Sequence, residues 1–128
     1  MIKIKNINKI PEKDDGFRIY MDDSWPDDVS KKEAEIDLCL KDIAPSTKLS
    51  ESFKMDPTRW SEFKEGYQDE LRSKKTLISL VRNLEKEHDT ITLVYSAEND
   101  NKNSAVLLRD KLEGYRTIHT HIDRIHGG

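Results

Sequence analysis

Five polar residues next to expected strand ends and turns have side chains that could bind a small anion: Arg18, Lys41, Ser46, Ser96 and Asn103. Arginine and lysine supply positive charge, while hydroxyl and amide groups can donate hydrogen bonds to a phosphate or carboxylate. Ligands of open α/β sheets bind outside the carboxyl ends of the strands, where helix N-termini also present free N–H groups. We therefore expect a small-ligand site at the carboxyl edge of a sheet.

The same residues also have a structural interpretation. Asn103 and Ser46 are good N-caps for the helices that would follow them, and Lys41 can be a solvated surface lysine. The residue types leave both interpretations open. They assign no catalytic residue, so the expected function is ligand binding, and whether the protein is an enzyme is left open.

An acidic loop surrounds Trp25-Pro26 and contains four aspartates, Asp22, Asp23, Asp27 and Asp28. Hard cations require several carboxylate oxygens that converge, but the spacing does not match the calcium-binding loop. We therefore expect a solvated loop without a metal. Such a loop offers an alternative function, a non-catalytic protein-interaction module that uses the acidic Trp25 loop or an exposed sheet edge.

The remaining residues that could do chemistry are the histidines near the C-terminus and the single cysteine. His119 and His121 would share one face of a strand, and His126 could approach them, which would make a modest metal site. A solvated strand face explains the first two without a metal, so we expect neither a metal nor a cofactor. Cys39 has no histidine base at an identifiable spacing, and we expect it to fill apolar space.

The strands that must position these residues follow from the hydrophobic pattern. Alternation of isoleucine and lysine over residues 2–5 predicts a strand near a sheet edge. Aromatic and branched residues predict a second strand over 17–21 and a central, buried strand over 90–95. A final alternation predicts a last strand over 115–122.

Capping residues and apolar spacing predict the helices. Ser30 and Glu33 have the capping-box spacing, and Asp56-Pro57 begins another helix, in which Met55 would staple onto Trp60. Apolar residues at helical spacing mark the expected buried faces: Trp60, Phe63, Tyr67 and Leu71, then Leu77, Leu80, Val81 and Leu84, and finally Ala105, Leu108 and Leu112.

Length and composition further restrict the possible fold and function. The 128 residues fit a single α/β domain over 1–128 with a flexible tail over about 123–128, three-layer-like, with a mainly parallel, possibly mixed sheet flanked by helices. The 22 basic residues nearly balance the 25 acidic ones, so general nucleic-acid binding is not expected. One cysteine, no signal-peptide pattern and no membrane-length apolar run predict a cytoplasmic protein without a membrane segment.

A known family shares several segments with this chain, in the same order. They are Asp15-Gly16-Phe17-Arg18, Trp25-Pro26, Lys41-Asp42-Ile43-Ala44-Pro45-Ser46, Asp56-Pro57 with Trp60, Phe63 and Tyr67, and Leu93-Val94-Tyr95. Together they resemble the YeaO-like proteins, family 488 among the bacterial domains of unknown function. The resemblance implies a small cytoplasmic α/β domain with a largely parallel sheet, but it supplies no activity.

This chain departs from the family pattern in two places. Asp23 and Asp27 stand where similar members usually carry arginines around the Trp-Pro pair. After the central strand a Lys-Asp-Glu pattern and a His-Asn pair are usual, and only Asn103 is retained. Because aspartate cannot replace the donor fork of arginine, an anion-binding or acid–base site of the family would be mostly lost here.

Overall fold

The sheet of the computed structural model, which describes residues 1–114, has four parallel strands in the order β1-β4-β2-β3. The α/β class is therefore confirmed, and the sheet is wholly parallel. The strands are β1 (Ile2–Asn6), β2 (Phe17–Tyr20), β3 (Leu38–Cys39) and β4 (Ile91–Tyr95).

β4 is the central element of the sheet. All five of its residues are buried, and it pairs with β1 on one side and with β2 on the other. Ile91 faces Ile2 in one register and Phe17 in the other. β-Branched and aromatic residues suit such a doubly covered strand. The predictions of a central strand here and of an edge strand at residues 2–5 are both confirmed.

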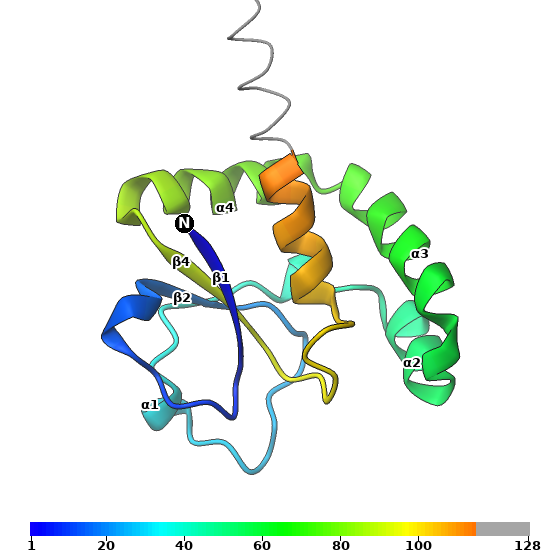
Figure 1. Cartoon of the computed structure of the whole chain (residues 1–128), viewed down its shortest axis with the longest axis horizontal. Helices are drawn as coiled ribbons and strands as arrows, with labels where there is room; N and C mark the ends of the chain where they lie inside the picture. The colour runs from blue at the N-terminus through cyan, green and yellow to red at the C-terminus, as the bar shows by residue number, and fades with distance from the viewer. Residues whose placement is uncertain (115–128) are drawn as a thin grey trace, which may run out of the picture.

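Helices follow the strands as the caps predict. The α-helices are α1 (Lys31–Ala34), α2 (Thr47–Met55), α3 (Trp60–Arg72) and α4 (Lys75–His88), and the 3₁₀ turns are η1 (Lys13–Asp15), η2 (Lys41–Ile43) and η3 (Pro57–Arg59). A further helix begins at Ser104 and continues to the end of the described chain. Figure 1 shows α4 along the top of the molecule and α2 and α3 at its right-hand end.

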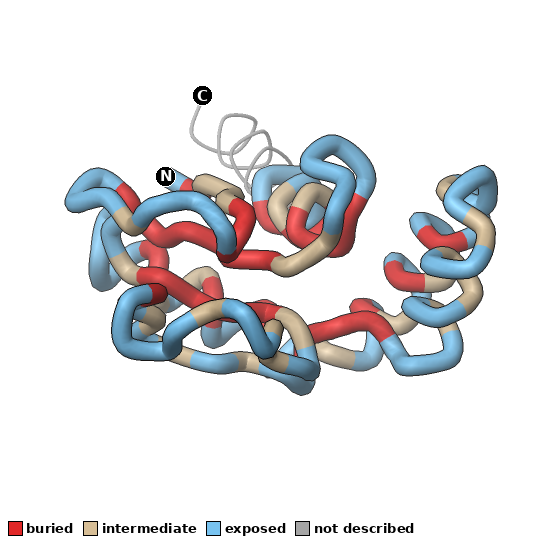
Figure 2. Tube along the Cα trace, turned by 90° about the horizontal axis from the view of Figure 1, so that it is seen from below, coloured by how far each residue is buried: buried red, intermediate tan, exposed pale blue. Residues whose placement is uncertain are grey.

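The main core lies on one face of the sheet. Phe63, Tyr67 and Leu71 of α3 pack there with Val81 of α4 and Leu108 of the last helix. Burial of large apolar side chains stabilises this arrangement by roughly 1.5–3 kcal/mol each. Figure 2 shows the buried segments running through the middle of the molecule, with exposed chain outside.

Two expectations about this core are wrong. Met55 is 87% exposed, so it does not staple onto Trp60. Leu80 is 40% exposed and does not belong to the inner face of α4, whereas Leu77, Val81 and Leu84 pack on the core as expected, together with Ile78.

The opposite face of the sheet is covered by short segments instead of long helices. Tyr20 and Val94 pack there against Ala34 of α1, and Trp25 closes the cluster from outside. Gly16 connects η1 to β2 with φ 63°, and a Cβ there would lie 2.2 Å from the Thr90 carbonyl oxygen. The turn that covers this face therefore requires glycine.

The structure contradicts the expectation for Cys39, and several features expected near the C-terminus lie outside the part of the chain that it describes. Cys39 is exposed and free, which corrects the expectation that it fills apolar space. The predicted strand at 115–122, the tail at 123–128 and the histidines His119, His121 and His126 lie outside the described residues. Within residues 1–114, no group of three or more potential metal ligands is present and no helix is long and apolar enough to cross a bilayer.

Candidate functional site

At the carboxyl edge of the sheet, the chain segments that follow β2 and β4 turn to opposite faces of the sheet. Trp25 and Val29, which follow β2, pack on the face of Tyr20 and Val94. The helix after β4 packs on the other face through residues such as Ala105. Such a divergence is the usual place for ligands in open α/β sheets.

Asp22 occupies this edge between β2 and β4. Its Oδ2 accepts hydrogen bonds from the backbone N–H and the hydroxyl of Ser96, each at 2.7 Å. Burial raises the pKa of Asp22 above its usual value, although the bonds from Ser96 act in the opposite direction. The two donors that an external anion would need at Ser96 are therefore given to an internal carboxylate.

The other side of the same loop is fastened to β1. Asn6 Nδ2 donates to the carbonyl oxygen of Ala97 at 2.8 Å and to Asp100 Oδ1 at 3.4 Å. The Tyr95 hydroxyl donates to the same Asp100 oxygen at 2.8 Å. Burial, helped by Asp100, raises the pKa of Tyr95 to about 12, so this tyrosine remains a proton donor. Asn6 of β1, Tyr95 of β4 and Asp22, which follows β2, thus hold the loop after β4.

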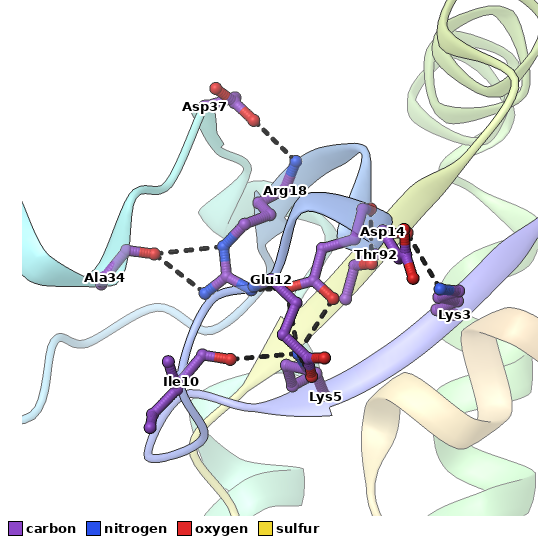
Figure 3. Close-up of polar contacts among 10 residues, drawn as sticks. Lys3, Lys5, Ile10, Glu12, Asp14, Arg18, Ala34, Asp37 and Thr92 are labelled. Carbon is purple, nitrogen blue, oxygen red and sulfur yellow. Dashed lines mark hydrogen bonds and ion pairs between the residues drawn. The ribbon is translucent and has the colours of Figure 1, made fainter.

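The side chain of Arg18 lies away from this edge, on the face of the sheet that Ala34 covers. Its Nη1 lies 2.6 Å from Asp15 Oδ2, and its Nε and Nη2 both donate to the carbonyl oxygen of Ala34, at 3.1 and 2.8 Å. Lys5 Nζ lies 2.9 Å from the second oxygen of Asp15. Figure 3 shows the contacts of this network, with dashed lines from the Arg18 guanidinium to the carbonyl oxygen of Ala34. Its donors and acceptors satisfy one another.

The titration of this network follows from its contacts. Burial would raise the pKa of Asp15, but the backbone N–H of Glu12 together with Lys5 and Arg18 outweighs it, and the pKa is lowered. Burial would lower the pKa of Lys5, but Glu12 and Asp15 outweigh it, and the pKa is raised. Both groups are therefore held in their charged forms.

The remaining expected ligand residues act mainly as caps. Asn103 Oδ1 accepts from the N–H of Val106, and Ser46 Oγ accepts from the N–H of Leu49, both as N-caps. Lys41 is exposed on η2. The structure brings Ser96 and Asn103 into one loop, while Arg18 lies in its own buried network.

A groove with a volume of about 880 Å³ opens at the ends of β1 and β4. Its size falls in the range of ligand pockets. The groove is lined by Ile4, Lys5, Asn6, Asn8, Lys9, Ile10, Glu12, Tyr95 and Asp100. None of the five expected site residues lines it.

Sequence reasoning missed Asp22 and Asn6 as residues of this edge. The aspartates around Trp25 predict only a solvated loop for Asp22, and no pattern singles out Asn6, which follows the predicted strand over residues 2–5. The available signal was position, because both are polar and stand directly at the carboxyl end of a strand. Their partners are 74 and 91 residues away, which no local pattern indicates.

Comparison with known proteins identifies the family. A family model described as the inactive DUF488-N3 subclade matches residues 1–121, so the chain belongs to this family. The uncharacterised protein YeaO of Escherichia coli is 32% identical over 111 residues, which cover 87% of this chain and 96% of YeaO. The uncharacterised protein Rv3073c of Mycobacterium tuberculosis is 32% identical over 79 residues, 62% of this chain and 67% of that protein. No solved structure gives a significant match.

Proposed function

We propose that this member of the inactive DUF488-N3 subclade is a non-catalytic interaction module whose acidic carboxyl edge binds a basic segment of a partner protein. The observation that carries the proposal is the bond pair from Ser96 to Asp22, which fills the ligand position of the fold with an internal carboxylate. The N–H and the hydroxyl of Ser96 are therefore not available to an anionic substrate.

Exposed carboxylates continue the acidic edge beyond Asp22. Asp23, Asp27 and Asp28 are exposed in the loop after β2, and Glu98 is exposed in the loop after β4. β2 and β4 are parallel neighbours, so both loops leave the same edge of the sheet. Carboxylates gathered at one edge attract a positively charged partner and repel an anionic one.

Trp25 gives this edge an aromatic surface beside the charges. Its indole Nε1 donates to the carbonyl oxygen of Val29 at 2.8 Å, which holds the ring in place. Lys31 Nζ lies 5.8 Å from the ring centroid, so the ring already contacts one cation of the chain itself. A lysine or arginine of a partner could gain from the same kind of contact, roughly 0.5–1 kcal/mol at an exposed site.

The family departures support this direction of charge. According to the family resemblance, Asp23 and Asp27 stand where similar members usually carry arginines. The change removes two donor forks and adds two negative charges to the edge. It favours a basic partner over a phosphate-like ligand.

A labelled oligolysine peptide of eight residues is a suitable probe. We expect its fluorescence anisotropy titration to show binding at low salt that weakens by tenfold or more at about 0.2 M salt, because exposed charges are screened. The variant D23N/D27N/D28N should weaken binding at least fivefold. The matched control E51Q/E65Q/E87Q removes the same charge from exposed positions in or next to the helices and should leave binding nearly unchanged.

Two results would contradict the proposal. Equal weakening by the triple variant and its control would mean that only net charge matters. Binding of inorganic phosphate to the native protein, measured by calorimetry at low salt, would favour the small-anion interpretation instead. The variant D23R/D27R separates the two further, since it should abolish peptide binding, whereas a small-anion site would gain affinity.

A further inference from the structure

Within residues 1–114, β1 is an edge strand, and no other strand pairs with its outer side. Within the sheet it pairs only with β4, and the bonds from Ile7 N to Tyr95 O and from Ile91 N to Met1 O show that its odd-numbered residues face β4. Backbone groups of alternate residues in a strand point to opposite sides, so those of Ile2 and Ile4 point outward. Among residues 1–114 no backbone group bonds to these outward N–H and C=O groups.

The groove described above runs over this free edge. Ile4 packs with the main core on one face of the sheet, whereas Lys5 joins the ionic network on the other face. Both residues line the groove, which therefore extends across the edge between them. Ile10, 82% exposed, adds an apolar wall. An extended chain placed here would find backbone partners and apolar contacts together.

The charged residues that line the groove are Lys5, Lys9, Glu12 and Asp100, and they differ in whether they already have partners within residues 1–114. Asp100 accepts from Tyr95 and Asn6, and Glu12 lies 2.8 Å from Lys5 Nζ, so both acidic groups already have donors. Lys9 lines the groove, and within the described chain no hydrogen bond or ion pair engages its ammonium group. A negatively charged group at this end of the groove would therefore meet an uncommitted positive charge.

The direction of β1 decides which end of a peptide meets Lys9. Lys9 follows Asn6 and its backbone N–H donates to the Asn6 carbonyl, so it stands at the carboxyl end of the strand. A strand added parallel to β1 would bring its own carboxyl terminus to this end. An antiparallel strand would bring an amino terminus, whose positive charge Lys9 would repel.

We propose that the free edge of β1 binds the carboxyl-terminal segment of a partner protein, which adds as a parallel strand and places its terminal carboxylate at Lys9. Main-chain hydrogen bonds to Ile4, the outward-facing residue of β1 that lines the groove, hold the segment, as in other cases of strand addition. Ile4 and Ile10 select apolar side chains near its end. This site is separate from the acidic edge of the Trp25 loop and does not depend on it.

A labelled hexapeptide with the sequence Gly-Ser-Thr-Val-Thr-Val and a free carboxylate tests the proposal against full-length protein. We expect saturable binding by fluorescence anisotropy, and at least fivefold weaker binding for the same peptide with an amidated terminus. The variant Lys9→Gln should weaken the free-acid peptide by a similar factor and leave the amidated peptide unchanged. The control Lys13→Gln, which removes an exposed lysine from η1, should change neither.

Backbone pairing is tested without altering the protein. Methylating the peptide nitrogens that would face β1 should abolish binding, whereas methylating the alternate nitrogens should have little effect. In amide NMR spectra the free-acid peptide should shift the signals of Ile2, Ile4 and Asn6 more than those of α3. These readouts remain interpretable even if a variant of β1 fails to fold.

Four results would overturn the proposal. They are an absence of binding at millimolar peptide, equal affinity of the acid and amide peptides, binding that appears only after residues 115–128 are removed, and a stable dimer that the peptide dissociates. The third would show that the chain's own segment occupies the edge, and the fourth that a second copy does. Binding of the hexapeptide in the variant D23N/D27N/D28N keeps this test independent of the acidic edge.

Discussion

The carboxylate of Asp22 accepts both the backbone N–H and the hydroxyl of Ser96 at 2.7 Å, across the carboxyl ends of two neighbouring strands. Burial raises the pKa of this carboxyl, the bonds from Ser96 oppose the shift, and the like-charged Asp23 adds to it. The pair therefore joins the loops after β2 and β4 and places a carboxyl group where it is poorly solvated. Stability and binding at this edge should both depend on the charge of Asp22.

Replacing Asp22 by asparagine should change how stability depends on pH. Because burial raises the pKa of Asp22, the native state binds a proton more readily than the unfolded state. The contribution of Asp22 to the free energy of unfolding should therefore fall as pH rises from about 4 through the raised pKa. Asp22→Asn keeps an acceptor for Ser96 and should lack this fall, so its stability relative to the native protein should increase between pH 4 and pH 8.

Urea denaturation at several pH values provides this measurement. Asp28→Asn, at an exposed position of the same loop, is the control and should follow the native curve. Parallel curves for the native protein and Asp22→Asn would mean that Asp22 titrates alike in the folded and unfolded states.

The buried ionic network should be sensitive to loss of its carboxylate. Asp15→Asn leaves Arg18 and Lys5 without their shared partner, and breaking a buried pair typically costs about 3–5 kcal/mol. Because the pKa of Asp15 is lowered, its contribution in the native protein is present above the unfolded pKa and is lost as pH falls through the folded pKa. Urea denaturation at pH 7 should show the loss, while Asp14→Asn at the exposed neighbour should cost under about 0.5 kcal/mol.

Two glycines should respond differently to the same substitution. Gly16→Ala would place a Cβ 2.2 Å from a backbone oxygen at positive φ, and we expect a loss of roughly 3 kcal/mol or more. Gly66→Ala in α3 would meet only the end of the Leu49 side chain at 2.8 Å, and gains up to about 1 kcal/mol of helix propensity. Thermal melting should show near-native behaviour for Gly66→Ala; similar losses at both sites would contradict the backbone argument.

The stability lost when an aromatic residue of α3 is truncated to alanine should increase with the burial of that residue. Phe63 is 5% exposed and stacks on Phe53 at 4.7 Å between ring centroids, so Phe63→Ala should cost about 3–5 kcal/mol. Trp60 is only partly buried beside the same rings, so Trp60→Ala should cost less, about 1–3 kcal/mol. Unfolding free energies in the reverse order would mean that the half-exposed tryptophan, and not Phe63, holds α3 to α2.

Local patterns were sufficient for most of the elements. The β-branched run before Tyr95 predicts the central strand, and Ser30, Ser46, Asp56 and Asn103 each cap the element that the sequence assigns to them. These features depend on neighbours in the chain, which the sequence displays directly. Met55 failed as a staple because whether a side chain near a helix start finds a partner depends on packing from other elements.

The candidate site was less accessible to the same reasoning. Arg18 looks like an anion ligand because it is a basic residue next to a turn, yet its guanidinium is satisfied by Asp15 and by the Ala34 carbonyl. Lys5 approaches the same carboxylate from another strand. Which charges meet is set by strand order, and strand order is a property of the assembled sheet that residue types do not encode locally.

The position of β4 between β1 and β2 also dictates when the sheet can form. A nascent chain that has emerged only to residue 90 carries β1 without the strand that it pairs with, and β2 can pair only with β3, over two residue pairs. β1 and β2 cannot pair with β4 until residues 91–95 have been synthesised. The pairing with β1 then forms contacts across nearly the whole chain. Contacts that close such long loops form slowly. Because β4 is also synthesised late, the isoleucines of β1 lack their partner strand through most of synthesis.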